Sequence, residues 1–296
     1  MRVFVSGASG FIGSAVVKEL LNNGHKVLGL ARSSSSAKTL TDLGAEVHNG
    51  SLDDLDSLKS GAAQCDGVLH LAFVHDFTDF AGSCAKDRLA IEAFGEALAG
   101  TGKPLVVTSG ILLLKGGAVR TEDDKPDMSG AGAIRAASEE VTMELTKKGV
   151  RAIIIRLAPS VHGEGDKGFV TQILAAAKEK GVSAYVGDGL NRWTAVHRLD
   201  AARLYRLAVE KGVAGGVYHG VADEAVPVKD IAEVIGKGLK VPVVSTSVEE
   251  AAQSLGFIAY AFSSDSPASS SKTREELGWK PEQPGLIADV EKAYFM

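Results

Sequence analysis

The fold of this chain is decided by an eight-residue stretch near its start, Ser6-Gly7-Ala8-Ser9-Gly10-Phe11-Ile12-Gly13. A short apolar strand pattern at residues 2–5 precedes the stretch, and an amphipathic helical pattern follows it. In that context Gly7 permits a tight turn, Gly10 lets a phosphate approach the backbone, and Gly13 lets the helix lie close to the strand. Three glycines can also mark a tight turn alone, but the strand before them and the helix after them favour a dinucleotide pyrophosphate site. The residues expected to contact the cofactor here are Gly7, Ser9, Gly10, Phe11, Ile12 and Gly13.

The composition limits the kind of partner. The chain has 296 residues, 45% of them hydrophobic, which is enough for one large α/β domain or for a nucleotide-binding core with a small lobe. A formal net charge of −5 offers no basic field for nucleic acid or for an anionic membrane surface. We therefore expect a small-molecule partner.

The cysteines and histidines indicate neither a metal site nor a disulfide framework. Cys65 and Cys84 form no C-x-x-C pair, and the seven histidines show no H-E-x-x-H spacing. No apolar run approaches the roughly 20 residues that span a bilayer, and the chain begins with a strand and no cationic leader. The expectation is a cytoplasmic protein without a metal ion.

Short β-branched runs alternate with helical patterns through the first half of the chain, which is typical of a parallel sheet with crossover helices. The runs are apolar throughout, as expected for strands covered on both faces. After the first strand, strands are expected at residues 26–31, 45–48, 68–73, 105–108 and 152–157. This pattern predicts an α/β Rossmann fold, a doubly wound parallel sheet with its ligand at the carboxyl ends of the strands.

The regular alternation ends near residue 158, where glycine-rich loops begin to separate helices expected at residues 199–211 and 228–239. We expect an NADP-binding Rossmann domain over residues 1–160 and a small mixed α/β substrate lobe over residues 161–296. Some strands and helices of the second part are expected to return to the Rossmann core.

The end of the second strand indicates which dinucleotide binds. Sites that prefer NAD usually carry an acidic residue there, which hydrogen-bonds the ribose 2′-hydroxyl. Here the strand is followed by Arg32 and Ser33, whose guanidinium fork, hydroxyl and N–H groups suit a 2′-phosphate. The sequence therefore favours NADP(H) over NAD(H). The alternative is that Arg32 is a solvated surface charge.

Motifs along nearly the full chain resemble those of extended and atypical short-chain dehydrogenase/reductases, the group that includes NAD-dependent epimerase/dehydratases and dihydroflavonol reductase-like enzymes. Besides the glycine stretch, the motifs are Gly50-Ser51-Leu52-Asp53, His70-Leu71-Ala72-Phe73, Val107-Thr108-Ser109-Gly110, Arg156-Leu157-Ala158-Pro159-Ser160-Val161-His162-Gly163, Val196-His197-Arg198-Leu199-Asp200 and Leu277-Gly278-Trp279-Lys280-Pro281. The resemblance implies the following cofactor contacts: Ser51 and Leu52 by the adenine, Leu71, Ala72 and Phe73 along the ribose and pyrophosphate, Thr108 and Ser109 beside the nicotinamide, and Pro159, Ser160 and Val161 by the carboxamide.

The chain departs from this family at the catalytic pair. Most members use a Tyr-x-x-x-Lys pair and a serine, and none of the five tyrosines here has a lysine four residues later. Aligning Ala137-Ser138-Glu139 with the family's segment after the lysine puts Arg135 in the lysine position and Ala131 in the tyrosine position. Gly110 falls where the catalytic serine would be, with Ser109 beside it. Arg135 can still hold the nicotinamide ribose, but a guanidinium cannot donate a proton at pH 7.

Another group, or water, must then supply the proton to a reduced carbonyl. The candidates are His75, which follows the fourth strand next to Asp76, together with His162, Ser109 and Tyr260. Each has a structural alternative: His75 as a loop residue, His162 in capping or packing, and Tyr260 as a core or lid aromatic.

Substrate contacts are expected from Asp76 and from Arg192 and Trp193, since relatives use an arginine near this place to grip substrate anions. A surface salt bridge is the alternative for Arg192. His197 and Asp200 are expected to fix the start of the following helix.

Three functions remain open. The first is an NADPH-dependent reductase of a ketone, aldehyde or enone, with hydride from the nicotinamide. The second is an epimerase or dehydratase, and the third is a non-catalytic NADP(H)-binding redox sensor. A homodimer formed through helices of the sheet domain, such as the stretch 89–99, is also expected from the resemblance.

Overall fold

A computed structural model describes residues 1–76, 78–130 and 132–295, without the side chains of residues 254, 257 and 260. Its main feature is a seven-stranded sheet in the order β10-β6-β5-β4-β1-β2-β3, in which every pairing is parallel. The strands are β1 (Arg2–Ser6), β2 (Lys26–Ala31), β3 (Glu46–Asn49), β4 (Gly67–His70), β5 (Pro104–Gly110), β6 (Arg151–Leu157) and β10 (Val217–Gly220). The strand order reverses between β1 and β4, and a ligand of such a sheet binds at the carboxyl ends of these two strands.

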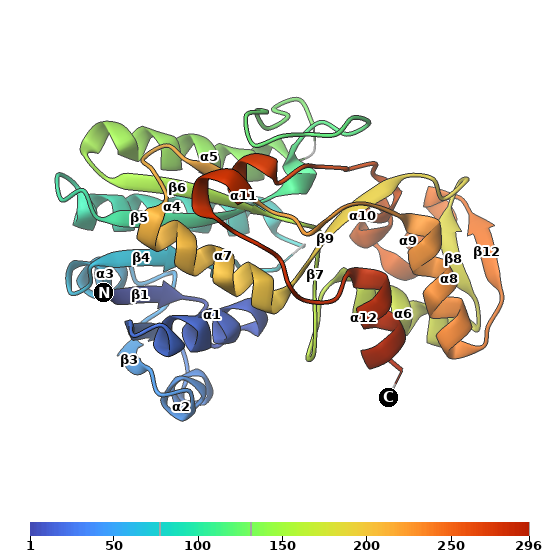
Figure 1. The fold of residues 1–296 in the computed structure, drawn as a ribbon, viewed down its shortest axis with the longest axis horizontal. Coiled ribbons are helices and arrows are strands. Elements are labelled where there is room, and N and C mark those ends of the chain that lie inside the picture. The colour runs from blue at the N-terminus through green and yellow to red at the C-terminus, as the bar shows by residue number, and fades with distance from the viewer. Residues whose placement is uncertain (77, 131, 296) are drawn as a thin grey trace.

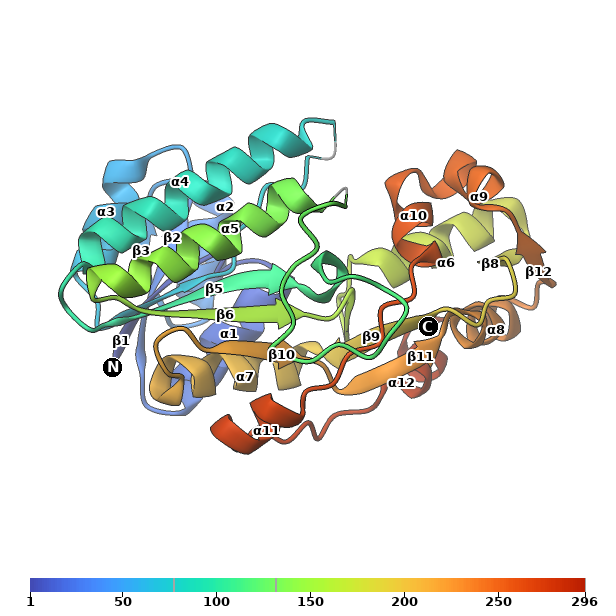
Figure 2. The ribbon, with the colours of Figure 1, turned by 90° about the horizontal axis from the view of Figure 1, so that it is seen from above.

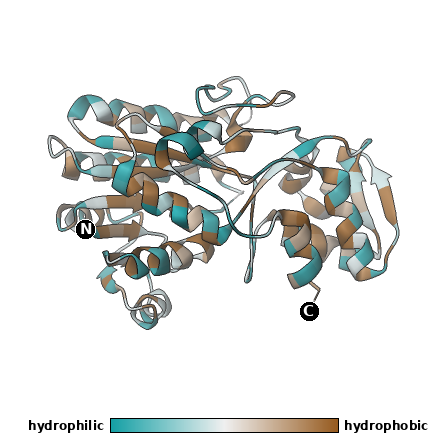
Figure 3. Cartoon of the chain, viewed as in Figure 1, coloured by the Kyte–Doolittle hydropathy of each residue, from teal (hydrophilic) through white to brown (hydrophobic). Residues whose placement is uncertain are grey.

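Helices cover both faces of the sheet (Figures 1 and 2). One face packs against α1 (Phe11–Asn22), α2 (Ser34–Asp42), α7 (Arg198–Lys211) and α11 (Ser271–Leu277). The other packs against α3 (Leu55–Ala63), α4 (Phe80–Leu98) and α5 (Ala133–Glu144). The short 3-10 helices η1 (Ile111–Leu113) and η2 (Leu145–Lys148) follow β5 and α5. The predicted doubly wound α/β fold is confirmed, and Figure 3 shows the hydrophobic residues concentrated in its strands.

The strands expected from sequence lie within a few residues of those observed, with one difference that matters for the site. The fourth strand ends at His70 and not at residue 73. Leu71 leaves the sheet after donating its N–H to the carbonyl O of Ser6. Residues 71–76 therefore form a loop over the carboxyl edge beside the glycine stretch.

A lobe beyond the sheet is built from two small sheets and five helices. One sheet joins β7 (Ser160–His162), β9 (Arg192–His197) and β11 (Asp223–Pro227), and the other pairs β8 (Ser183–Val186) with β12 (Val243–Thr246). The helices are α6 (Phe169–Lys180), α8 (Val228–Leu239), α9 (Val248–Leu255), α10 (Phe257–Ser263) and α12 (Leu286–Ala293). The chain returns to the main sheet twice, as α7 and β10 and again as α11, so the two parts are interleaved in sequence.

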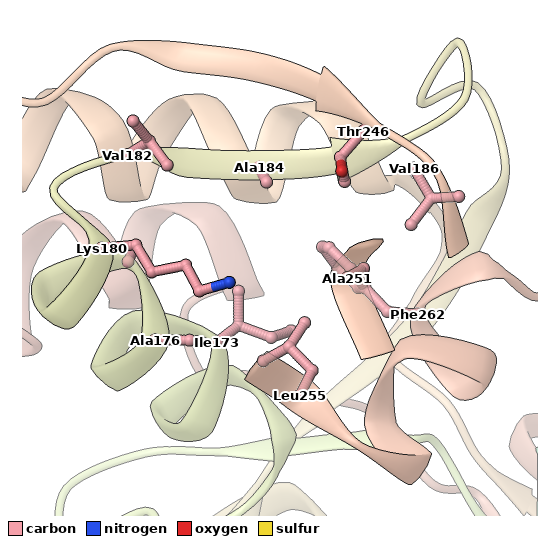
Figure 4. A pocket seen from close by; sticks show the side chains of 11 residues that line it. Ile173, Ala176, Lys180, Val182, Ala184, Val186, Thr246, Ala251, Leu255 and Phe262 are labelled. Atoms are coloured by element: carbon pink, nitrogen blue, oxygen red, sulfur yellow. The ribbon is translucent and has the colours of Figure 1, made fainter. Parts of the chain in front are cut away.

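A small apolar hollow lies inside the lobe between α6, β8 and α9, with Lys180 and Thr246 as its polar lining (Figure 4). Its volume is about 40 Å³, whereas pockets for small-molecule ligands measure about 300–1,000 Å³. The hollow is therefore too small to be the substrate site. No helix in the described part of the chain is long and apolar enough to cross a bilayer.

Candidate cofactor and active site

The glycine stretch forms the turn from β1 into α1 at the carboxyl edge of the sheet. Gly7 adopts a φ of 71°, and a Cβ atom there would lie 2.8 Å from the backbone N of Ala72. A Cβ at Gly13 would lie 2.0 Å from the carbonyl O of Gly7, so only glycine lets α1 start this close to the turn. Gly10 caps α1 without a side-chain hydrogen bond. The N–H groups of the first turn are left for an anion, which fits the pyrophosphate of a dinucleotide.

A second feature is a hollow of about 350 Å³ beside the ends of β2 and β3. It is lined by Ala31, Arg32, Ser33, Ser34, Asn49, Gly50, Ser51 and Asp54. Arg32 is exposed and takes part in no ion pair among the described residues. Ser33 Oγ accepts the N–H of Ser36 at 3.2 Å and so caps α2. Three residues assigned from sequence to the adenosine half, Arg32, Ser33 and Ser51, therefore share one hollow, while Leu52 packs against the core behind it.

Arg135 lies where β5 ends, next to the position predicted for the nicotinamide. Its Nη2 donates to the carbonyl O of Thr108 at 2.8 Å. Its guanidinium carbon lies 4.7 Å from the centre of the Phe73 ring, a cation–π contact. The structure thus gathers Phe73, Thr108 and Arg135, which were assigned to the cofactor from separate motifs.

A buried polar network, which was not predicted from the sequence, holds Arg135 in this place. Arg135 Nη1 donates to Asp87 Oδ2 at 2.8 Å, and the other carboxylate oxygen of Asp87 lies 3.3 Å from His70 Nε2. His70 Nδ1 lies 2.7 Å from Ser6 Oγ, directly before Gly7, and Ser138 also donates to Asp87. Burial alone would raise the pKa of Asp87, but the contacts with His70, Arg135 and Ser138 outweigh it and hold that pKa below its usual value. Asp87 is therefore a buried carboxylate that ties Arg135 to the glycine turn.

Ser109, which was predicted to act in catalysis, has its hydroxyl engaged by a carboxylate of the protein. Its hydroxyl donates to Glu139 Oε1 at 2.5 Å, and Glu139 accepts two further bonds from Arg156. All three side chains are buried. The hydroxyl hydrogen is thus held by the Glu139 carboxylate, and this bond fixes the end of β5 beside Thr108.

His75 lies on the exposed loop after β4, with its ring edge-on to Phe73 at a centroid distance of 5.3 Å. Desolvation lowers the pKa of His75, and the charge of Arg135 acts in the same direction. The imidazole is therefore mainly neutral at pH 7. Asp76, expected to meet the substrate, accepts bonds from the N–H and hydroxyl of Thr78 and so shapes the loop.

His162 was also expected as a proton donor, and the structure contradicts this. The ring is fully buried, and Nδ1 lies 2.7 Å from Asp289 Oδ2 of α12. Ser160 and His162 are buried while Val161 between them is half-buried, as the alternation of β7 requires. His162 joins the lobe to its last helix, and its burial leaves no ring surface for a substrate.

The predicted substrate residues of β9 have structural roles in this arrangement. Trp193 is fully buried and donates its indole N–H to the carbonyl O of Ala261 at 2.9 Å, so its assignment to the substrate was wrong. Arg192 forms two bonds with Asp265, of 2.9 and 2.8 Å, which is the salt bridge kept open as its alternative. The side chain of Tyr260 lies outside the described part of the structure.

The remaining predicted residues lie around the glycine turn, at the end of β6 and at the start of α7. Ala72 lies against Gly7, and Pro159 is half-buried at the end of β6. Ser160 Oγ is buried without a hydrogen-bond partner among the described residues. His197 caps α7 through Nδ1, and Asp200 lies in the first turn of α7, as expected. No three histidine, cysteine, aspartate or glutamate side chains in the described ranges are placed to hold a metal ion.

Comparison with known proteins shows what kind of site this is. A model of the NAD-dependent epimerase/dehydratase family matches residues 3–84. Sterol-4-alpha-carboxylate 3-dehydrogenase, decarboxylating, of Dictyostelium discoideum is 30% identical over 240 residues, which cover 76% of this chain and 72% of that protein. The chain belongs to the NAD-dependent epimerase/dehydratase family. An uncharacterized protein of Schizosaccharomyces pombe is 49% identical over the full length of both chains.

A solved structure has the same overall fold. The crystal structure of gox2253 superposes with a TM-score of 0.78 at 25% identity, covering 99% of this chain and 96% of that chain. The predicted resemblance to epimerase/dehydratases is confirmed. The protein is thus an NAD(P)-dependent enzyme of the oxidoreductase, epimerase or dehydratase type. Its candidate cofactor site has three parts: the glycine turn, the hollow that Arg32 lines (the Arg32 hollow), and the end of β5 where Arg135 lies.

Proposed function

We propose that the protein is an NADPH-dependent reductase of a small carbonyl compound, with a proton donor other than tyrosine. The observation that carries the proposal is the Arg135 guanidinium, fixed by buried Asp87 beside Thr108 and Phe73 in the position of the family's lysine. Vestitone reductase of Medicago sativa, 26% identical over 269 residues that cover 79% of this chain, gives a named reductase among the relatives.

The preference for NADPH rests on the Arg32 hollow. The exposed guanidinium there takes part in no ion pair among the described residues, so its charge is available to a 2′-phosphate. Asp54 also lines the hollow, but its Oδ1 accepts the N–H of Ser57 and caps α3. One of the two carboxylate oxygens of Asp54 is therefore engaged with the helix.

The residues of the chain have distinct tasks in this proposal. The nicotinamide supplies hydride when it is bound. Arg135 holds the nicotinamide ribose and keeps a permanent positive charge near the carbonyl oxygen, where negative charge develops. Arg135 cannot give up a proton. The proton for the reduced carbonyl oxygen therefore comes from the His75 imidazole or from a water molecule beside it. Phe73 contacts both groups, with the Arg135 guanidinium over its ring and the His75 ring edge-on to it.

The test is a fluorescence titration with NADPH and NADH, followed by absorbance at 340 nm with ketones, aldehydes and enones, including vestitone. Net consumption of NADPH with any compound supports a reductase. Conversion of a nucleotide sugar with no net NADPH consumption would make the protein an epimerase or dehydratase instead. Tight binding with neither reaction across the panel would leave the sensor function, which the engagement of Ser109 with Glu139 favours.

Dimerisation is a separate part of the proposal. Leu89 of α4 and Ile134 of α5 are large apolar residues that are 50% and 37% exposed on neighbouring helices. Covering this face with the same face of a second copy would remove both from water. Sedimentation of the wild type against Leu89→Lys tests the proposal, and a wild-type monomer contradicts it.

A further inference from the structure

The start of α7 lies beside the start of α1, and both helices begin at the cofactor edge. The two helices pack along each other on the same face of the sheet (Figure 1). Phe11 is the first residue of α1, and Arg198 is the first residue of α7. The guanidinium carbon of Arg198 lies 4.9 Å from the centre of the Phe11 ring. A positive side chain from the lobe side therefore lies over the glycine turn.

Arg198 forms no ion pair within the part of the chain that the structure describes. A cation at a helix N-terminus meets the positive end of the helix dipole, which is unfavourable unless an anion is near. Arg198 donates to the carbonyl O of Glu164 at 2.6 Å, and it has no carboxylate partner among the described residues. The next two arginines of α7 differ: Arg203 pairs with Glu282, and Arg206 pairs with Glu19 and Glu210.

The neighbouring backbone is shaped around the stem of Arg198. Gly163 has a φ of 134°, and a Cβ atom there would lie 3.0 Å from Arg198 Cγ and 2.8 Å from His197 Nε2. Any larger residue at position 163 would displace the arginine from this path. The loop after β7 and the start of α7 thus hold the guanidinium over Phe11 in the absence of any ion pair.

We propose that Arg198 binds the pyrophosphate of the dinucleotide from the side opposite the N–H groups of α1. The proposal rests on the cofactor site described above and adds a residue of the lobe to it. The guanidinium supplies the positive charge that the glycine turn lacks, since that turn offers only backbone N–H groups. Because the same side chain holds the carbonyl O of Glu164, a bound pyrophosphate also fixes the loop between β7 and α6.

The test separates the pyrophosphate from the 2′-phosphate by using fragments of the cofactor. Calorimetric titration measures the affinity of the full chain for ADP-ribose, which carries the pyrophosphate, and for adenosine 2′-monophosphate, which does not. Arg198→Ala is expected to weaken ADP-ribose, NADPH and NADH alike by about 10- to 100-fold, the range for losing a hydrogen bond between charged groups. Its affinity for adenosine 2′-monophosphate is expected to stay within twofold of the wild type.

Two further variants guard against indirect effects. Lys211→Ala removes an exposed cation from the far end of α7 and is expected to change neither affinity. Arg198→Lys keeps a positive charge and is expected to recover part of the ADP-ribose affinity. Equal losses for both fragments would show a general structural role, and an unchanged ADP-ribose affinity in Arg198→Ala would also overturn the proposal. If the wild type binds neither fragment nor NAD(P)H, the proposed cofactor site is wrong. This result differs from a failure of the Arg198 proposal alone, in which the wild type still binds the cofactor.

Discussion

The polar residues at the carboxyl edge of the sheet and those beneath the lobe's last helix are buried to a similar extent, but their surroundings differ. Asp87 is 2% exposed and its partner Arg135 reaches the edge beside Phe73 and Thr108. His162 is 0% exposed, and its partner Asp289 belongs to a helix that closes the lobe. The carboxylate of Asp87 therefore supports the candidate cofactor site, whereas the carboxylate of Asp289 joins the last helix to β7. Burial and a charged partner do not distinguish these roles, whereas the position of the partner does.

The largest effect is expected from Asp87→Ala. The free energy of unfolding should fall by about 3–5 kcal/mol, because Arg135 is left largely buried without its counter-charge. Urea unfolding measures this value. Asp42→Ala, which removes the exposed pair with Lys38, should cost less than about 1 kcal/mol and is the control. A loss of unfolding free energy for Asp87→Ala as small as that of the control would show that the contacts of Asp87 with Arg135, His70 and Ser138 do not stabilise the fold.

A smaller effect is expected from His162→Ala in the lobe. Leaving Asp289 without its partner should cost about 1–3 kcal/mol of unfolding free energy, the desolvation penalty of an unpaired polar group. The turnover number on an identified substrate should stay within twofold, because the buried ring does not reach the substrate. A large drop in turnover without a loss of stability would restore His162 as a proton donor.

Next in size is the effect of Arg32→Ala on cofactor choice. The dissociation constant for NADPH should rise about tenfold, equivalent to about 1.4 kcal/mol, while that for NADH changes little. Fluorescence titration with both cofactors measures the ratio. Lys38→Ala, an exposed cation of α2 that does not line the hollow, should leave the ratio unchanged. A constant ratio in Arg32→Ala would contradict the NADPH preference.

The smallest effect is a change in the pH profile in His75→Gln. Because the pKa of His75 is lowered from 6.5, the protonated imidazole is scarce at pH 7 and becomes more abundant as the pH falls through that lowered value. If the imidazolium donates the proton, kcat/KM of the wild type for carbonyl reduction should rise as the pH falls below neutrality. The variant should lack this rise. Identical profiles would assign the proton to water or to another group.

Most of the sheet domain could be predicted from sequence because each β-α unit is encoded locally. The apolar run before Gly7 and the helical pattern after Gly13 are contiguous, and β2 has the predicted bounds, Lys26–Ala31. The strand β10 was not identified, because each of its residues pairs with a residue of β6 that lies 63 positions earlier in the chain, as in Val217 with Ile154. Its short run, residues 217–220, has no local signal that separates it from the loops around it.

The site was predictable where a motif carries its own geometry and unpredictable where partners come from distant segments. Thr108 and Phe73 were each found within a motif, and Arg135 was found by its register with the family's lysine position. Asp87 was missed, although a lone acidic residue between the buried positions Cys84 and Ala90 of α4 is a signal that could have found it. The partners of Ser109 and Trp193, Glu139 and the carbonyl O of Ala261, were not predicted, because a residue's place along the chain does not tell which hydrogen-bond partner folding will supply.

The sequence by itself determined that this protein has a dinucleotide site, because the glycine spacing imposes the turn through backbone sterics alone. It also determined that no tyrosine of the chain is followed by a lysine four residues later, since the order of residues is sufficient to show this. Only the tertiary structure decided which polar side chains remain available for chemistry. Asp87, Glu139 and Asp289 each engage a residue that the motifs had singled out, over separations of 48, 30 and 127 residues. Such pairings follow from how the layers pack, and the short-range patterns of the chain do not contain that information.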